Sequence, residues 1–212
     1  PKSTNEDIQT IKTINQNAII YTPVESDLYS SPAKAEIFDL DGIDKIIEGE
    51  FRKGHFQGVA TVVKRLFEKF SPNYAFFGEK DYQQILVIEK IIKNYGLKVK
   101  IKSILTVREE NGLAMSSRNI LLDKETRYDA KIIYKSLCLA KKMIKTNDID
   151  KIKFFIGELF LVNKKFDLEY FCIAENSSLK EVKSFNSKLK LRAFICVKAK
   201  GGVRLIDNIA LF

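Results

Sequence analysis

The chain has 212 residues, of which 45% are hydrophobic and 30% are charged, as in a globular protein with a sizeable core. No apolar run approaches the ~20 residues that cross a bilayer, and no signal-peptide core is visible, so we expect no membrane association. The formal net charge is +9, but the lysines are spread along the whole chain, so the charge alone does not indicate binding of nucleic acid.

The first half of the sequence alternates apolar helices with short apolar strands. Ser71-Pro72-Asn73 separates one helix from the next strand, and Gly96 ends the following helix. This alternation is typical of a parallel, doubly wound sheet, so we predict a partial Rossmann-like domain. The predicted helices are 4–15, 43–48, 58–70 and 81–95, and the predicted strands are 18–21, 35–38, 74–77 and 97–107.

The pattern of the second half of the sequence differs from that of the first half, and it predicts a smaller α+β domain with two helices on an antiparallel sheet. Asp123 can cap a helix that runs to about Thr146, and Gly201-Gly202 is a hairpin signal. A second helix is expected at 150–164, with strands at 168–174, 191–199 and 203–208. We therefore expect a nucleotide-binding domain over 1–110, a hinge and phosphate-binding loop over 111–118, and a C-terminal lid domain over 119–212.

The three cysteines, Cys138, Cys172 and Cys196, lie in apolar runs. Their spacing is not that of metal ligands and their number is odd. We expect buried free thiols and a cytoplasmic protein.

The stretch GEKDYQQ (78–84) directly follows a predicted strand, at the edge where open α/β sheets bind ligands. Gly78 would allow a ligand to approach the backbone closely. Lys80 and the free N–H groups of the next helix would attract a phosphate. Asp81 could cap that helix or accept a hydrogen bond from a ribose hydroxyl, while Gln84 shares a helical face with Lys80. The alternative is an ordinary capped helix start with exposed charges.

A second polar cluster, GLAMSSRN (112–119), lies at the expected domain boundary. Ser116 and Ser117 supply donors, and the guanidinium of Arg118 has the planar geometry that suits phosphate. Met115 is soft enough to lie against a purine ring. The alternative is a polar interdomain loop whose serines serve turn chemistry.

The only histidine of the sequence, His55, lies in RKGHFQGVATVV (52–63). A lone histidine could act as a general acid, but it is more often a structural residue, and we interpret it so here.

These stretches, in this order, closely resemble the pantoate–β-alanine ligase family, nearly end to end. The resemblance rests on EGEFRKGHFQGVATVVKRLF, PNYAFFGEKDYQQILVI and REENGLAMSSRN, with support from TPVESDLY (22–29) and RLIDN (204–208). It implies a nucleotidyltransferase-type Rossmann-like fold and a two-step reaction. Pantoate attacks the α-phosphate of ATP, with Mg²⁺ assisting, and the amine of β-alanine then displaces AMP.

The resemblance also implies roles for individual residues. Lys80, Ser116, Ser117 and Arg118 would hold phosphates and carry the catalysis, and Gln84 would bind pantoate. ATP would be lined by Gly78, Glu79, Lys80, Asp81, Val107, Met115, Ser116, Ser117 and Arg118, with Val107 and Met115 against the adenine. We expect small-molecule substrates only, no protein metal site, and a homodimer.

One departure from the family pattern is the absence of an H-x-G-H motif, which in the family carries the catalytic histidine. His55 matches a different histidine of the family. We therefore expect these residues to be part of a longer protein. Two alternatives stay open: another adenylate-forming or nucleotidyltransferase enzyme of the same superfold, and a non-catalytic fragment without the histidine loop.

Overall fold

The structure is a computed structural model that describes residues 4–29, 36–146, 148–186 and 188–212. The chain divides into two compact units, residues 1–35 and residues 36–212, and each is described by itself. The predicted domain boundaries at 110 and 118 stay a prediction.

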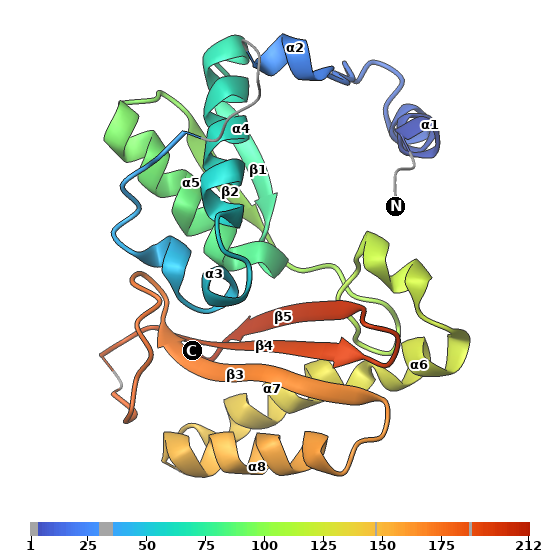
Figure 1. The fold of residues 1–212 in the computed structure, drawn as a ribbon, viewed down its shortest axis with the longest axis vertical. Helices are drawn as coiled ribbons and strands as arrows, with labels where there is room; N and C mark the ends of the chain where they lie inside the picture. Colours follow the sequence, from blue (N-terminus) through green and yellow to red (C-terminus); the bar gives the residue numbers. More distant parts are fainter. Residues whose placement is uncertain (1–3, 30–35, 147, 187) are drawn as a thin grey trace. The chain divides into compact units, whose positions relative to one another are not determined.

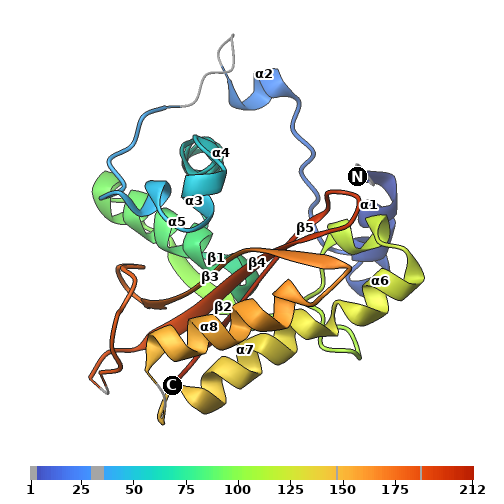
Figure 2. The ribbon, with the colours of Figure 1, turned by 60° about the horizontal axis from the view of Figure 1, so that its bottom comes forward.

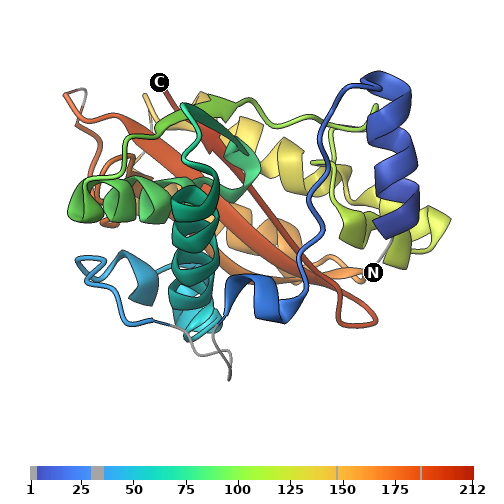
Figure 3. The same ribbon diagram turned by 90° about the horizontal axis from the view of Figure 1, so that it is seen from above.

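The first unit contains two helices, α1 (Thr4–Ile14) and α2 (Glu25–Leu28), joined by an extended stretch (Figure 3). The helix predicted at 4–15 is confirmed. The buried strand predicted at 18–21 is wrong, because these residues form no strand and Ile19 is 98% exposed. An apolar run becomes a strand only when a neighbouring strand supplies hydrogen bonds, and none of the described residues does so here.

The second unit begins with helices packed on a small parallel sheet (Figure 1). Strands β1 and β2 pair in parallel from Tyr74 with Lys100 to Gly78 with Ile104. Apolar residues of α4 and α5 pack on the inward side chains of both strands. The elements of this half are η1 (Ile43–Lys45), α3 (Glu48–Phe51), α4 (His55–Phe70), β1 (Tyr74–Gly78), η2 (Glu79–Asp81), α5 (Tyr82–Tyr95) and β2 (Lys100–Ile104).

Three expectations about this half need correction. The strand predicted at 35–38 is not formed by residues 36–38, because the backbone N–H groups of Glu36 and Phe38 donate to side chains of α4, and residue 35 lies outside the described residues. The helix predicted at 43–48 is split into η1 and α3, with Ile47 between them at φ 51°. Strand β1 is not buried on both faces, since Phe76 on its outward side is 67% exposed.

The rest of the unit is an antiparallel sheet in the order β3-β4-β5, covered on one face by α7 and α8 (Figure 2). Gly201 and Gly202, at φ +95° and +85°, make the predicted hairpin turn. Asp123 caps a helix as expected through Thr126 N at 2.8 Å, but the helix breaks at Ala130. The elements are η3 (Ser117–Leu121), α6 (Lys124–Asp129), α7 (Lys131–Met143), α8 (Ile149–Leu161), β3 (Phe166–Glu175), β4 (Leu191–Ala199) and β5 (Arg204–Ala210).

The opposite face of this sheet contacts the first half of the unit. Phe194 and Ala174 pack with Ile46, Ile47 and Leu86, which joins the two halves through an apolar cluster. The predicted class, a parallel sheet followed by a smaller antiparallel α+β part, is confirmed. Within the described residues, every helix is too short or too polar to cross a bilayer.

The cysteines are free thiols, but only Cys196 is fully buried. Cys138 and Cys172 are partly exposed, although burial raises the pKa of the Cys172 thiol to about 12.

The core of the antiparallel half gives a stability prediction. Ile152 of α8 is 0% exposed, so Ile152→Ala should leave a cavity and lower the free energy of unfolding by about 2–5 kcal/mol. Leu161→Ala, at a 78% exposed position of the same helix, is the control and should change it by less than ~0.5 kcal/mol. Urea unfolding followed by circular dichroism measures both, and equal effects would contradict this account of the core.

Candidate active site

A pocket opens at the carboxyl end of β1, where the strand passes into η2 and α5. It contains Lys80, Asp81 and Gln84 from the GEKDYQQ stretch, together with His55 at the start of α4. Its other walls come from α3, β3, β4 and β5. The lining residues are Ile47, Glu48, Arg52, His55, Phe56, Lys80, Asp81, Tyr82, Gln83, Gln84, Tyr170, Phe194, Ile206, Asp207 and Asn208.

A second, smaller pocket adjoins the first. Lys80 and Ile206 line both pockets, and the second also contains Ser116, Arg118 and Arg204. The two polar stretches singled out in the sequence therefore meet at Lys80, although Lys80 and Ser116 are 36 positions apart in the chain.

The other predicted site residues line neither pocket. Glu79 pairs with Arg192 at 3.3 Å, so its carboxylate is already neutralised. Val107 and Met115 are 62% and 56% exposed and are held side by side by a Met115 N–H bond to Val107 O of 2.9 Å. Ser117 starts η3 and is exposed.

Two details of the GEKDYQQ stretch differ from expectation. Asp81 does not cap α5, because its carboxylate accepts no capping bond among the described residues and lies 3.5 Å from Lys80 Nζ. Gln83 is buried and donates to Ile43 O and Ile46 O, both at 2.7 Å, so it fixes the loop before α3. Gln84 lines the pocket.

His55 is held by Arg52, whose Nη1 lies 2.8 Å from His55 Nε2. A guanidinium can only donate, so Nε2 accepts and the imidazole is neutral. Burial, together with the nearby charge of Arg52, lowers the pKa of His55. The contact favours the structural interpretation, with His55 orienting a cation that lines the pocket.

A buried ion-pair cluster around Arg204 was not foreseen from the sequence. Arg204 donates to Glu48 Oε1 at 2.6 Å and, through Nε, to Glu169 Oε2 at 2.8 Å. Tyr170 also donates to Glu48, at 3.1 Å. The one signal for this cluster was the match of RLIDN to the family, which includes Arg204.

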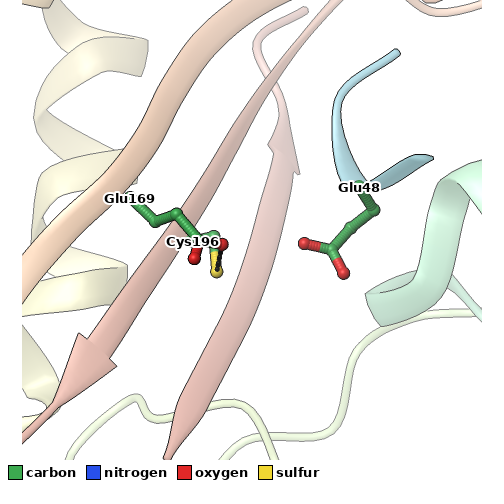
Figure 4. A group of neighbouring side chains, drawn as sticks. All are labelled: Glu48, Glu169 and Cys196. Atoms are coloured by element: carbon green, nitrogen blue, oxygen red, sulfur yellow. Dashed lines mark hydrogen bonds between the residues drawn. The ribbon is translucent and has the colours of Figure 1, made fainter. Parts of the chain in front are cut away.

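Glu48, Glu169 and Cys196 place potential metal-ligand atoms within 4.8 Å of one another. Figure 4 shows Glu48 reaching from α3 toward the other two side chains, which lie on β3 and β4. Arg204 pairs with both carboxylates and Lys198 pairs with Glu169 at 2.7 Å, so two cations balance the two carboxylates. The group therefore serves as an ion-pair cluster, and a metal ion there would be repelled by the guanidinium.

The neighbouring residues of β5 were also missed. Arg108, at the start of the 108–119 loop, forms a bidentate ion pair with Asp207, with N–O distances of 2.6 and 3.0 Å. Burial raises the pKa of Asp207, and the bonds from Arg108 oppose that rise. Asn208 contacts the backbone of the Lys80 turn.

Comparison with known proteins decides the family. Residues 1–210 match the family described as pantoate-beta-alanine ligase. The chain is 39% identical to pantothenate synthetase of Flavobacterium psychrophilum and 40% identical to that of Christiangramia forsetii. Each alignment covers 100% of this chain and 74% of the relative.

The chain belongs to the pantoate–β-alanine ligase family.

The solved structures agree with this assignment. The crystal structure of pantothenate synthetase from Thermus thermophilus matches with a TM-score of 0.89 at 30% identity, over 100% of this chain and 76% of that one. The ligase from Francisella tularensis, complexed with β-γ ATP and β-alanine, matches at 0.75 and 29% identity, over 100% and 71%. The predicted ligase is thus confirmed: it is an enzyme that joins pantoate to β-alanine, and its family uses ATP.

The Arg204 cluster predicts an acid-dependent loss of stability. Burial alone would raise the pKa of Glu169, but hydrogen bonds from Arg204, Lys198 and Cys196 outweigh it and lower the pKa from 4.5 to about 2. A lowered folded-state pKa stabilises the fold above pH 4.5, and this contribution is lost as the pH falls toward about 2.

Glu169→Gln should therefore be less stable than the wild type at neutral pH and should lose less stability between pH 4.5 and about 2. Glu158→Gln, at an exposed position of α8, is the control and should keep the wild-type profile. Urea midpoints measured across this pH range test the prediction, and parallel curves for wild type and Glu169→Gln would contradict it.

Proposed function

We propose that the two joined pockets carry out the ligation in two steps, through a pantoyl adenylate. The observation that supports this is the position of Lys80, which lines a pocket with Gln84 on one side and a pocket with Ser116 and Arg118 on the other. An acid bound near Gln84 and a triphosphate bound near Arg118 would meet beside the ammonium group of Lys80.

In the first step, a carboxylate oxygen of pantoate attacks the α-phosphate of ATP, and pyrophosphate leaves. Negative charge builds up on the phosphate oxygens, and positioned cations stabilise it. Lys80 is suited to this role because the ion pair found for its ammonium group among the described residues is a long one, 3.5 Å to Asp81. Arg118 forms no ion pair with any residue in the described parts of the chain, which leaves its guanidinium available for phosphate.

In the second step, the amine of β-alanine attacks the acyl carbon, and AMP leaves with the electron pair of the broken C–O bond. Both steps depend on holding reactants in line more than on covalent catalysis. Gln84 would orient pantoate, Asp81 would accept from the ribose, and Val107 with Met115 would contact the adenine. Gly78, Glu79 and Ser117 complete the proposed ATP site.

Mg²⁺ is proposed to enter as part of the ATP substrate. Around Lys80 the pockets offer one solvent-exposed carboxylate, Asp81, while Glu48 is paired with Arg204. Octahedral Mg²⁺ prefers oxygen ligands and commonly takes them from phosphates and water. It would neutralise phosphate charge during the attack.

We also propose that the ligase acts in the cytoplasm on small molecules, without nucleic acid, and as a homodimer. The three cysteines, all in described parts of the chain, are free, as is usual in a reducing compartment. The homodimer is an expectation from the family, and sedimentation equilibrium would test it.

The central test is Lys80→Ala in the natural protein. Pantoate-dependent exchange of pyrophosphate into ATP should fall about 100-fold or more, because the ammonium group stabilises charge and does not pack in the core. Lys93→Ala, an exposed lysine of α5 outside both pockets, is the control and should keep the wild-type rate. A wild-type exchange rate in folded Lys80→Ala would refute the assignment.

Gly78 offers a second test. Its φ of −73° suits any residue, and apart from Gly78 and its two chain neighbours no heavy atom of the described residues lies within 4 Å of where a Cβ would be. Gly78→Ala should therefore fold normally, yet raise KM for ATP about tenfold or more if the nucleotide approaches this backbone.

Gly58→Ala is the matched control, because a Cβ there also meets open space and Gly58 lines neither pocket. Steady-state kinetics with ATP as the varied substrate separate the two variants. An unchanged KM in Gly78→Ala would mean that ATP does not contact Gly78.

A further inference from the structure

Strand β5 is hydrogen-bonded to the backbone of the turn that contains Lys80. Asn208 is 4% exposed, and its Nδ2 donates to Glu79 O at 2.9 Å and to Lys80 O at 2.8 Å. The amide group of this one side chain thus donates to two successive carbonyl groups of η2.

The orientation of the Asn208 amide is fixed by Arg192. Arg192 Nη1 lies 2.5 Å from Asn208 Oδ1, and because a guanidinium only donates, the oxygen must face it and the NH₂ group must face the turn. Arg192 is itself held over the ring of Tyr82, at 3.8 Å from the centroid, and by Glu79 at 3.3 Å. The first residues of η2 and α5 are therefore held from the side of the antiparallel sheet.

Asp207, the neighbour of Asn208, contacts the other site loop. It accepts two bonds from Arg108, which also donates to Gly112 O at 3.1 Å and stacks on Tyr134 at 3.7 Å. A buried ion pair adds little net stability, but removing one partner is costly, so such a pair fixes geometry. Two successive residues of β5 thus attach to the two loops that supply Lys80 and Ser116–Arg118.

We propose that Asn208 is a positioning residue for the ligation. It holds the main chain of Lys80, while Asp207 holds Arg108, so that the two phosphate-binding loops keep a fixed spacing across β5. This proposal rests on the function proposed above for Lys80. Leu205 and Ile206, which precede the pair on the same strand, line the pocket between the loops.

The first experiment is Asn208→Ala in the natural protein. Pantoate-dependent pyrophosphate exchange should lose about 100-fold in kcat, because a displacement of the lysine by about 1 Å is enough for such a loss. The KM for pantoate should change far less than kcat. ATP binding, measured by titration without pantoate, should weaken about tenfold.

The matched control is Asn163→Ala. Asn163 also uses its side chain to hold backbone groups, accepting from Lys165 N at 2.8 Å and Phe166 N at 3.0 Å, but it lines neither pocket. This control should lower Tm without changing kcat or ATP binding. Asn208→Asp is a second variant of the same size, and it should lose activity as well because a carboxylate would face two carbonyl oxygens.

A double-mutant cycle separates positioning from plain structural support. In a Lys80→Ala background, Asn208→Ala should have little further effect on exchange, since the group that it positions is gone. Fully additive losses, or wild-type kcat and ATP affinity in folded Asn208→Ala, would overturn the proposal. Absence of exchange in the wild type would count against the proposed function instead, and the ATP titration would still decide the role of Asn208.

Discussion

The antiparallel sheet meets the Lys80 turn, α3 and the 108–119 loop through ion pairs whose side chains are at most 21% exposed. Arg192 meets Glu79, Arg204 meets Glu48, and Arg108 meets Asp207. Taking these charges out of water costs several kcal/mol for each ion, and only close, well-oriented partners offset that cost. The two halves of residues 36–212 can therefore meet in few arrangements, and the pockets lie at that junction.

The apolar packing of α7 and α8 on one face of the antiparallel sheet leaves the opposite face free to form the pockets. Helices α7 and α8 cover one face of the antiparallel sheet, so the other face meets the loops before α3 and α5. Gln83 fixes the loop before α3 through two hydrogen bonds to carbonyl groups, whereas the neighbouring Gln84 lines the pocket. Tyr82 lines the pocket as well, and the guanidinium of Arg192 lies over its ring, 3.8 Å from the centroid.

Local signals in the sequence predicted the elements that depend on local physics. Helix α5, the Gly201-Gly202 hairpin and the Asp123 cap all follow from residues within a few positions of one another. Predictions failed where a distant partner decides the outcome. Residues 36–38 bond to side chains of α4 instead of a strand, and Arg204 and Asn208 find partners more than 120 positions away. The two polar stretches and strand β5 could be predicted from the sequence, but the side-chain bonds that join them could not.

Part of the positive charge of the chain, whose formal net value is +9, lies at the pockets. Arg52, Lys80 and Arg118 lie around the two pockets, whereas the guanidinium groups of Arg108, Arg192 and Arg204 are neutralised by buried carboxylates. Burial lowers the pKa of Arg52, and repulsion from Arg118 and Arg204 adds to that effect against the pull of Glu48. Like charges held close in a partly buried site repel each other strongly, since screening by water is weak there. A bound polyphosphate would replace that repulsion with attraction, so the same cations that destabilise the free site would favour ATP within it.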